Sequence, residues 1–150
     1  MIKITDIRTF FDNTKFDVRA CGILRHNDKV LVSYEPDGSI TLNGGAVSIG
    51  ESTEQAVVRE FFEETNLYVQ VDSLVAVIEN FFTLNSHSYQ QIVFVYGLSL
   101  IDLKEQELKC KEKLNARWEK IEDINNLKPV ILNKVIKSNN KEIQHYINRD

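Results

Sequence analysis

The residues best suited to chemistry in this sequence are acidic ones that recur at short spacing between positions 51 and 64. On a helix, at about 100° per residue, Glu60, Glu63 and Glu64 fall within an arc of roughly 100°. Like charges three and four residues apart destabilise a helix by about 0.2–0.5 kcal/mol per pair, so this arc is a local cost. The arc suits a hard cation, because Mg²⁺ binds through a few carboxylates and keeps waters and substrate phosphates in its other positions. The alternative is an acidic face in contact with solvent.

Signals for a helix surround these carboxylates. Ser52 can cap the first turn while Gln55, three residues on, reaches back, and together they form a capping box. The run 53–65 contains no Gly or Pro, and Asn66 follows it. Asn is the usual substitute for Gly in the left-handed position that ends a helix. We therefore predict a helix over residues 53–65, with one apolar flank and one acidic flank.

A larger set of residues around this helix has a fixed spacing. The set comprises Gly45, Glu51, Arg59, Glu60, Glu63 and Glu64, followed by the apolar Leu67. This pattern resembles the Nudix box. With each residue type used at roughly one in fifteen, six specified positions match by chance about once in 10⁷ windows. The family's usual Gly near the end of the box is Asn66 here, which keeps the geometry of the helix end.

The resemblance implies a role for each residue of the box. The implied metal ligands, for Mg²⁺ or for Mn²⁺ in its place, are Glu60, Glu63, Glu64 and the backbone carbonyl of Gly45. One of the box glutamates, or a glutamate outside the box, would take the proton of the attacking water. Glu51 and Arg59 would complete the catalytic set by fixing the glycine loop against the helix. Their alternative is an ordinary surface ion pair, which contributes little to stability.

The resemblance also implies a fold and a reaction. The fold is an α/β/α sandwich with a mixed sheet, the box helix on one side and a C-terminal helix on the other. The reaction is hydrolysis of a phosphoanhydride bond in a nucleoside diphosphate linked to another group, such as a nucleoside triphosphate or a sugar nucleotide. Three alternatives stay open: a non-catalytic module that senses a nucleotide, a diphosphate isomerase and an RNA-decapping hydrolase. The sensor would normally have lost box glutamates, and here all are present.

The composition is that of an ordinary globular protein. The 150 residues fit one domain, residues 1–150, with 27% charged and 43% hydrophobic residues. A net charge of −4 argues against a nucleic-acid backbone as the main partner and favours a small nucleotide. No stretch reaches the roughly 20 apolar residues of a membrane helix, so a cytoplasmic protein is expected. Cys21 and Cys110 are predicted to be free thiols, and a homodimer stays open.

Apolar, β-branched runs separated by turn residues predict the strands. They cover residues 17–24, 30–34, 40–42, 68–71, 74–82, 89–100 and 116–121. A short helix is expected at 122–127. Pro129 is expected to open a final helix over 130–138, because proline favours the first turn of a helix.

Residues outside the box bear on the substrate. Tyr34, Phe82 and Trp118 are the aromatic candidates for stacking on a nucleobase, although core packing is the simpler role for each. Candidates for an additional carboxylate are Glu105, Glu107 and Glu112, with solvated surface charges as the alternative. In the family, a Pro marks ADP-ribose hydrolases and a Tyr marks dinucleoside polyphosphate hydrolases, in a window that falls at 82–85 here. Neither signature is present.

Two segments depart from the family pattern. The family segment Leu-Pro-Gly-Gly reads Leu42-Asn43-Gly44-Gly45 here, and loss of the proline makes the loop less rigid. A bacterial branch of the family carries His-Glu where this chain has Gln90-Gln91. We therefore expect no catalytic role for this pair.

Overall fold

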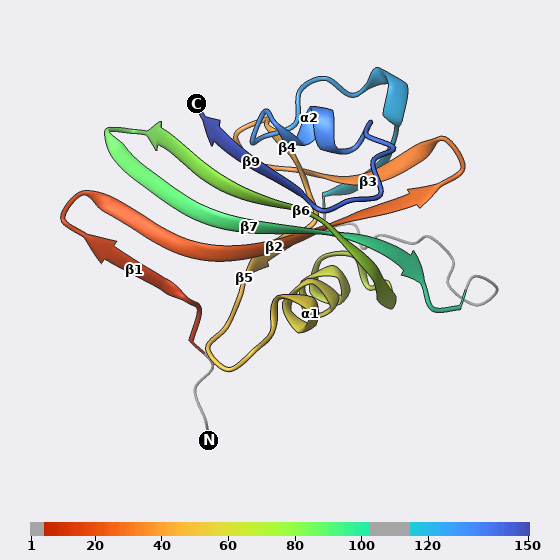
Figure 1. The fold of residues 1–150 in the computed structure, drawn as a ribbon, viewed down its shortest axis with the longest axis horizontal. Helices are drawn as coiled ribbons and strands as arrows, with labels where there is room; N and C mark the ends of the chain where they lie inside the picture. The colour runs from red at the N-terminus through yellow and green to blue at the C-terminus, as the bar shows by residue number, and fades with distance from the viewer. Residues whose placement is uncertain (1–4, 103–114) are drawn as a thin grey trace.

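The computed structural model describes residues 5–102 and 115–150, and a single mixed sheet forms its centre (Figure 1). The strands are β1 (Arg8–Phe11), β2 (Thr14–His26), β3 (Lys29–Tyr34), β4 (Ile40–Leu42), β5 (Gly44–Ala46), β6 (Val69–Leu84), β7 (His87–Leu100), β8 (Ala116–Lys120) and β9 (Gln144–Arg149). The main path through the sheet is β4-β3-β2-β7-β6-β9, while β1 and β5 pair with β2, and β8 pairs with β3. The pairs β2·β7 and β6·β9 are parallel and the others are antiparallel.

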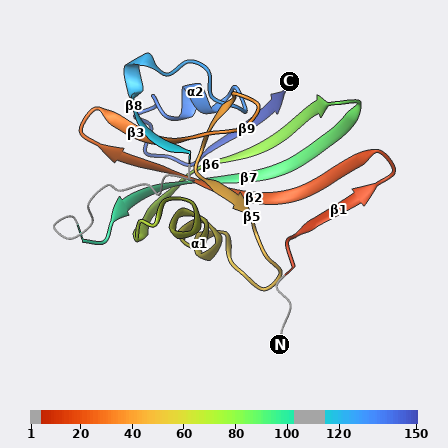
Figure 2. The same ribbon diagram turned by 180° about the vertical axis from the view of Figure 1, so that it is seen from behind.

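Helices cover both faces of this sheet. Helix α1 (Thr53–Thr65) lies on one face, and α2 (Leu132–Val135) lies on the other with the C-terminal segment (Figures 1 and 2). On the α1 side, Phe61 belongs to a buried cluster with Leu98 of β7. On the α2 side, Leu132 belongs to a second cluster formed with β2, β6 and β7. The predicted α/β/α arrangement with a mixed sheet is confirmed, although the second helical layer is short.

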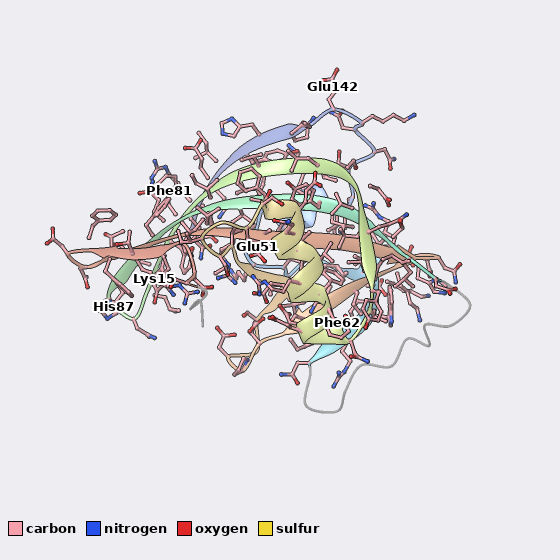
Figure 3. The ribbon with its side chains drawn as sticks, turned by 90° about the horizontal axis from the view of Figure 1, so that it is seen from below. Lys15, Glu51, Phe62, Phe81, His87 and Glu142 are labelled. Carbon is pink, nitrogen blue, oxygen red and sulfur yellow. The ribbon has the colours of Figure 1, made fainter. Side chains whose placement is uncertain are left out.

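The predicted helix over 53–65 is α1, with the same bounds. Its capping box is formed: the Gln55 N–H donates to Oγ of Ser52 at 3.0 Å, and the Ser52 N–H donates to Oε1 of Gln55 at 2.9 Å. Asn66 ends the helix in the left-handed region, at φ 64°, and its N–H donates to the Phe62 carbonyl. Figure 3 shows α1 crossing in front of the strands, with Glu51 and Phe62 labelled toward opposite ends.

The C-terminal part of the chain differs from the prediction. In place of a helix at 122–127 there is a 3₁₀ turn, η1 (Ile121–Asp123), and the helix expected over 130–138 contains only Leu132–Val135. Strand β9 was not predicted. It is held by parallel pairing with β6, in a register that joins Ala76 to Gln144. This partner lies far away in the sequence, so no local pattern of residues marks the strand.

The long strands also exceed their predicted bounds. The two runs at 68–71 and 74–82 form one strand, β6, whose register with β7 shifts between Val71 and Ser73 and between Leu74 and Ala76. The turn that follows contains Asn85 and Ser86, both with positive φ. The short strands β1 and β5 were missed, because each has only a few residues and depends on β2 for its hydrogen bonds. In residues 5–102 and 115–150, no helix is long and apolar enough to cross a membrane.

The conformation of Asn66 predicts a difference between two substitutions. Asn66→Gly should leave the free energy of unfolding nearly unchanged, because glycine adopts φ 64° without steric cost. Asn66→Ala should lower it by about 1–2 kcal/mol, since a Cβ disfavours the left-handed region, and the melting temperature should fall by roughly 2–8 °C. Melting curves measure both, with Asn139→Ala, in an exposed loop, as the control. Equal melting temperatures for the Gly and Ala variants would contradict this account.

Candidate functional site

The bend at Asn43 and the two glycines that begin β5, together called the glycine turn here (residues 43–45), bring backbone unusually close to other groups. A Cβ placed on Gly44 would lie 2.1 Å from the Ala20 carbonyl oxygen. A Cβ placed on Gly45 would lie 2.5 Å from the carboxylate carbon of Glu60. At Gly44 the clash would be with backbone atoms, so only glycine fits there, whereas at Gly45 it would be with the end of the Glu60 side chain, which would have to move aside. The Glu60 carboxylate therefore rests directly against the Gly45 backbone.

Arg59 connects the helix to the loop that precedes it. Its Nε and Nη2 donate to the two oxygens of Glu51 at 2.7 and 2.9 Å, and Nη2 also donates to the Ala46 carbonyl at 3.1 Å. Its Nη1 lies 2.9 Å from Oε1 of Glu60 and 3.2 Å from Oε2 of Glu63. One guanidinium thus partly neutralises three carboxylates of the box. It offsets part of the repulsion that we expected on this helix.

Glu64 points away from Arg59 and toward the glycine turn. The side-chain Nδ2 of Asn43 donates to its Oε2 at 3.0 Å, and the Gly44 N–H donates to its Oε1 at 3.2 Å. Burial raises the pKa of Glu64 to about 7, although these two hydrogen bonds act in the opposite direction. Asn43, which stands at the family's proline position, therefore contacts a candidate metal ligand. Its own Oδ1 is buried and has no hydrogen-bond partner among the described residues.

The donor atoms around the glycine turn suit a hard divalent cation. Carboxylate and carbonyl oxygens are the protein ligands that Mg²⁺ prefers, and the box glutamates and Gly45 offer only such atoms. Within residues 5–102 and 115–150, no three His, Cys, Asp or Glu side chains already converge as a metal site. The reason is visible in the contacts: Glu60 and Glu63 face Arg59, while Glu64 faces Asn43. The residues fit the metal chemically, and binding it would require the carboxylates to exchange some of these contacts for the metal.

A cleft of about 690 Å³ extends from the glycine turn across the α2 side of the sheet. Gly44, Gly45 and Glu64 lie on its wall, so one end of the cleft is the carboxylate site. Tyr34 and Phe82, two of the aromatic candidates, also line it. So do Thr83 and Leu84, which belong to the window that carries the substrate signatures in the family.

The remaining candidates lie elsewhere. Trp118 is not among the described residues that line the cleft; it packs against the cluster on the α1 side, with its ring centroid 5.9 Å from that of His26. Core packing, the simpler of its two expected roles, is what its position supports. Glu105, Glu107 and Glu112 lie outside the described residues.

Sequence reasoning missed several residues that line the cleft. They are Arg19, Asn43, Asn80, Gln91 and Lys128. Arg19 and Lys128 bring positive charge to the cleft of a chain whose net charge is −4. The available signals were two departures from the family pattern, Asn43 at the proline position and Gln91 in the pair that replaces His-Glu. The others come together only through strand register, which the sequence does not display.

Comparison with known proteins agrees with this geometry. The family model of the NUDIX domain matches residues 15–137. An ADP-ribose pyrophosphatase of Methanocaldococcus jannaschii is 31% identical over 131 residues, which cover 85% of this chain and 73% of that protein. A solved NUDIX hydrolase of Nitrosomonas europaea has a TM-score of 0.67 at 22% identity, over 89% of this chain and 79% of that one. A solved ADP-ribose pyrophosphatase of Streptococcus suis has a TM-score of 0.59 at 17% identity, over 88% and 98%.

The chain therefore belongs to the NUDIX domain family of pyrophosphohydrolases. The two solved structures, at low identity, show that the fold is shared. The hydrolase class expected from the box is confirmed. Enzymes of this family generally need a divalent metal, in agreement with the oxygen donors around the glycine turn.

The pair Glu51–Arg59 predicts a pH-dependent stability. Hydrogen bonding to Arg59 lowers the pKa of Glu51 below its usual value of 4.5. A lowered folded-state pKa stabilises the protein above the unfolded value, and this stabilisation is lost as pH falls through the folded value. Glu51→Gln should therefore cost about 1 kcal/mol at pH 7, a modest figure because both side chains are partly exposed.

Urea unfolding at pH 7, 5 and 3.5 measures this effect. The difference in unfolding free energy between wild type and Glu51→Gln should be constant above about pH 5 and should shrink at pH 3.5. Glu54→Gln, on an exposed glutamate of the same helix, is the control. A difference that is as large at pH 3.5 as at pH 7 would mean that the ion pair does not stabilise the folded chain.

Proposed function

We propose that this protein is a Mg²⁺-dependent hydrolase of a nucleoside diphosphate linked to another group, and that sugar nucleotides of the ADP-ribose type are its substrates. The observation that carries the proposal is the contact between the box helix and the glycine turn at one end of the cleft. There the Glu60 carboxylate rests on Gly45, and Glu64 accepts the Gly44 N–H. The carboxylates and the backbone of Gly44 and Gly45 thus meet at the end of the cleft, where a diphosphate would enter.

Both the relatives and the cleft support this substrate class. The relative from Methanocaldococcus jannaschii is an ADP-ribose pyrophosphatase, and the two sequences are 31% identical over 85% of this chain. The cleft, at about 690 Å³, falls within the roughly 300–1,000 Å³ of small-molecule sites. Tyr34 and Phe82 offer aromatic surface for a nucleobase. The family's signature proline for ADP-ribose is absent, so other sugar nucleotides belong in the same test.

In the proposed mechanism, different residues bind the metal, position the loop and attract the substrate. Glu60, Glu63, Glu64 and the Gly45 carbonyl would hold Mg²⁺. When bound, the metal neutralises the diphosphate and makes a water nucleophilic enough to attack phosphorus. Arg59 and Glu51 keep the loop and the helix in register, so that the carboxylates stay beside the glycine turn. Arg19 and Lys128 contribute positive charge to the cleft that receives the anionic substrate.

One of the glutamates takes the proton that the attacking water loses. The bond that breaks joins phosphorus to the bridging oxygen of the diphosphate, and the bridging oxygen leaves with one of the two phosphate groups. From ADP-ribose the products are AMP and ribose 5-phosphate. From a nucleoside triphosphate the same reaction gives a nucleoside monophosphate and pyrophosphate.

The proposal is tested by metal dependence and by two substitutions. Hydrolysis of a panel of nucleotides should require a divalent cation, and product masses should show cleavage within the phosphate chain. Glu63→Gln or Glu64→Gln should lower turnover by at least about 10²-fold, because positioning the metal and water accounts for most of the catalysis. Glu54→Gln, which lies in the first turn of the same helix, should keep wild-type turnover. Wild-type rates in the Glu63 and Glu64 variants, or release of a free nucleobase, would refute the assignment.

Metal binding itself predicts an effect on stability. Without metal, Glu64→Gln removes the repulsive i,i+4 pair with Glu60, of about 0.2–0.5 kcal/mol, so the variant should melt up to roughly 1–2 °C higher than wild type. With millimolar Mg²⁺, wild type should gain stability, since a ligand that binds only the folded state stabilises it, and Glu64→Gln should gain much less. Melting curves in EDTA and in Mg²⁺ measure both effects. If Mg²⁺ shifts the two proteins equally, the carboxylate arc is only a solvated face.

A further inference from the structure

A row of polar side chains crosses the sheet at the cleft. In the strand register, Asn148 of β9 lies beside Asn80 of β6, and Asn80 lies beside Gln91 of β7. Residues paired in this way project to the same face of a sheet. Asn80 is 2% exposed and Asn148 is 8% exposed, while Asn80 and Gln91 line the cleft. Buried amides are costly unless they are hydrogen-bonded, so the pattern of bonds along this row is informative.

The backbone fixes the direction of these hydrogen bonds. The N–H of Ile131 can only donate, and it donates to Oδ1 of Asn148 at 3.2 Å. Nδ2 of Asn148 donates to Oδ1 of Asn80 at 2.8 Å, and Nδ2 of Asn80 donates to Oε1 of Gln91 at 3.1 Å. Because each amide oxygen accepts from the preceding donor, each amide nitrogen is left to donate to the next side chain in the row. The row ends at Nε2 of Gln91, which has no hydrogen bond to any residue that the structure describes.

The row of amides lies along the strands from the carboxylate site, at a distance that the strand register gives. Gly45 pairs with Ala20 of β2, whereas Gln91 is level with Asp17 of β2, three residues further along the strand. At roughly 3.3 Å per residue, this separates Gln91 from the glycine turn by about 10 Å along the strands. The next pair outward on the same face of the sheet is Phe82 with Tyr89, whose rings stack with centroids 4.6 Å apart. A nucleotide with its phosphates at Gly45 would therefore bring its base to Gln91 and Phe82.

We propose that Gln91 determines base specificity: its side-chain N–H donates a hydrogen bond to a ring nitrogen or carbonyl oxygen of the substrate's nucleobase. This inference rests on the proposed function for its substrate class. Asn80 and Asn148 are positioning residues, since they hold the Gln91 amide with its nitrogen toward the cleft. A glutamine free to rotate could present either its oxygen or its nitrogen, and so would select less strictly. The fixed row turns Gln91 into a donor only.

Gln90 provides a matched control on the same strand. It is the same residue type and the immediate neighbour of Gln91, but it is exposed and, by the alternation of a strand, projects to the opposite face. Gln90→Leu therefore removes an amide without touching the row. Gln91→Leu removes the proposed donor at similar size. An effect seen in Gln91→Leu but not in Gln90→Leu is therefore due to the position of Gln91 in the cleft.

The first experiment measures binding without turnover. Dissociation constants of AMP, IMP, UMP and CMP are determined by titration calorimetry in Mg²⁺ for wild type and both variants. We expect the dissociation constants of the four nucleotides to differ in wild type. Gln91→Leu should bind the preferred nucleotide about tenfold more weakly, and its four constants should lie closer together. Gln90→Leu should match wild type. Unchanged constants in Gln91→Leu overturn the inference. Because no hydrolysis is needed, this result is independent of whether the proposed reaction occurs.

A second variant covers the case in which Gln91→Leu does not fold. Gln91→Glu keeps the size and the acceptor for Asn80 but offers no donor at neutral pH, so it should weaken the preferred nucleotide at least as much as the Leu variant. Binding at the wild-type level would overturn the inference. Asn148→Asp retains the acceptor for the Ile131 N–H and removes the donor to Asn80. It should narrow the spread of constants, although Asn148 is not among the residues that line the cleft. An unchanged spread would refute its positioning role.

The steady-state readout separates recognition from chemistry. With the substrate that wild type hydrolyses best, Gln91→Leu should raise KM about tenfold and leave kcat within about twofold, because the row lies about 10 Å from the glycine turn. A fall in kcat with constant KM would place Gln91 in the chemical step and would overturn the inference. The proposed function would stand in either case, since it depends on the carboxylates.

Discussion

The close approach of Glu60 to Gly45 is the constraint on which the site depends. A Cβ at position 45 would meet the Glu60 carboxylate and displace it, so this contact between the helix and the glycine turn requires glycine there. Arg59 then fixes the distance by holding Glu51, Glu60 and the Ala46 carbonyl together. Strand pairing places the turn against β2, and the capping box starts the helix at Thr53. The strand pairing with β2 and the hydrogen bonds of Arg59 thereby join the sheet, the glycine turn and the helix.

Features encoded within a few neighbouring residues could be predicted from the sequence. The ends of α1 follow from Ser52, Gln55 and Asn66, whose effects are local and depend on backbone groups within four residues. The box residues could be selected because their types and spacing resemble the Nudix box. The hydrolase class was implied by this resemblance and not by the helical pattern itself. The pairing of Glu51 with Arg59 was implied by the resemblance, but the contacts of Glu60 with Arg59 and of Glu64 with Asn43 could not be foreseen, because rotamers depend on all neighbours at once.

Features that depend on distant partners could not be predicted. Strand β9 has no strong pattern of its own and exists through its parallel pairing with β6. Pro129 and an apolar run predicted a final helix over 130–138, but only Leu132–Val135 is helical, and the cluster on that face of the sheet also takes Ile136 from outside the helix. Trp118 resembled a base-stacking residue by type alone, and its strand places it on the opposite cluster. In each case long-range packing decided between local alternatives of similar free energy.

The division between local and distant determinants also explains why the box identifies the reaction better than the substrate. The carboxylates come from one helix and one turn, so a short continuous pattern specifies them. The cleft that would receive the rest of the substrate is assembled from β2, β3, β6, β7 and the C-terminal segment, which meet through strand pairing and long-range packing. Single residues on these strands can change without disturbing the helix or the turn. Recognition can therefore vary among proteins that keep the same chemical centre, and in this chain the wall of the cleft includes the hydrogen-bonded amides of Asn80 and Gln91.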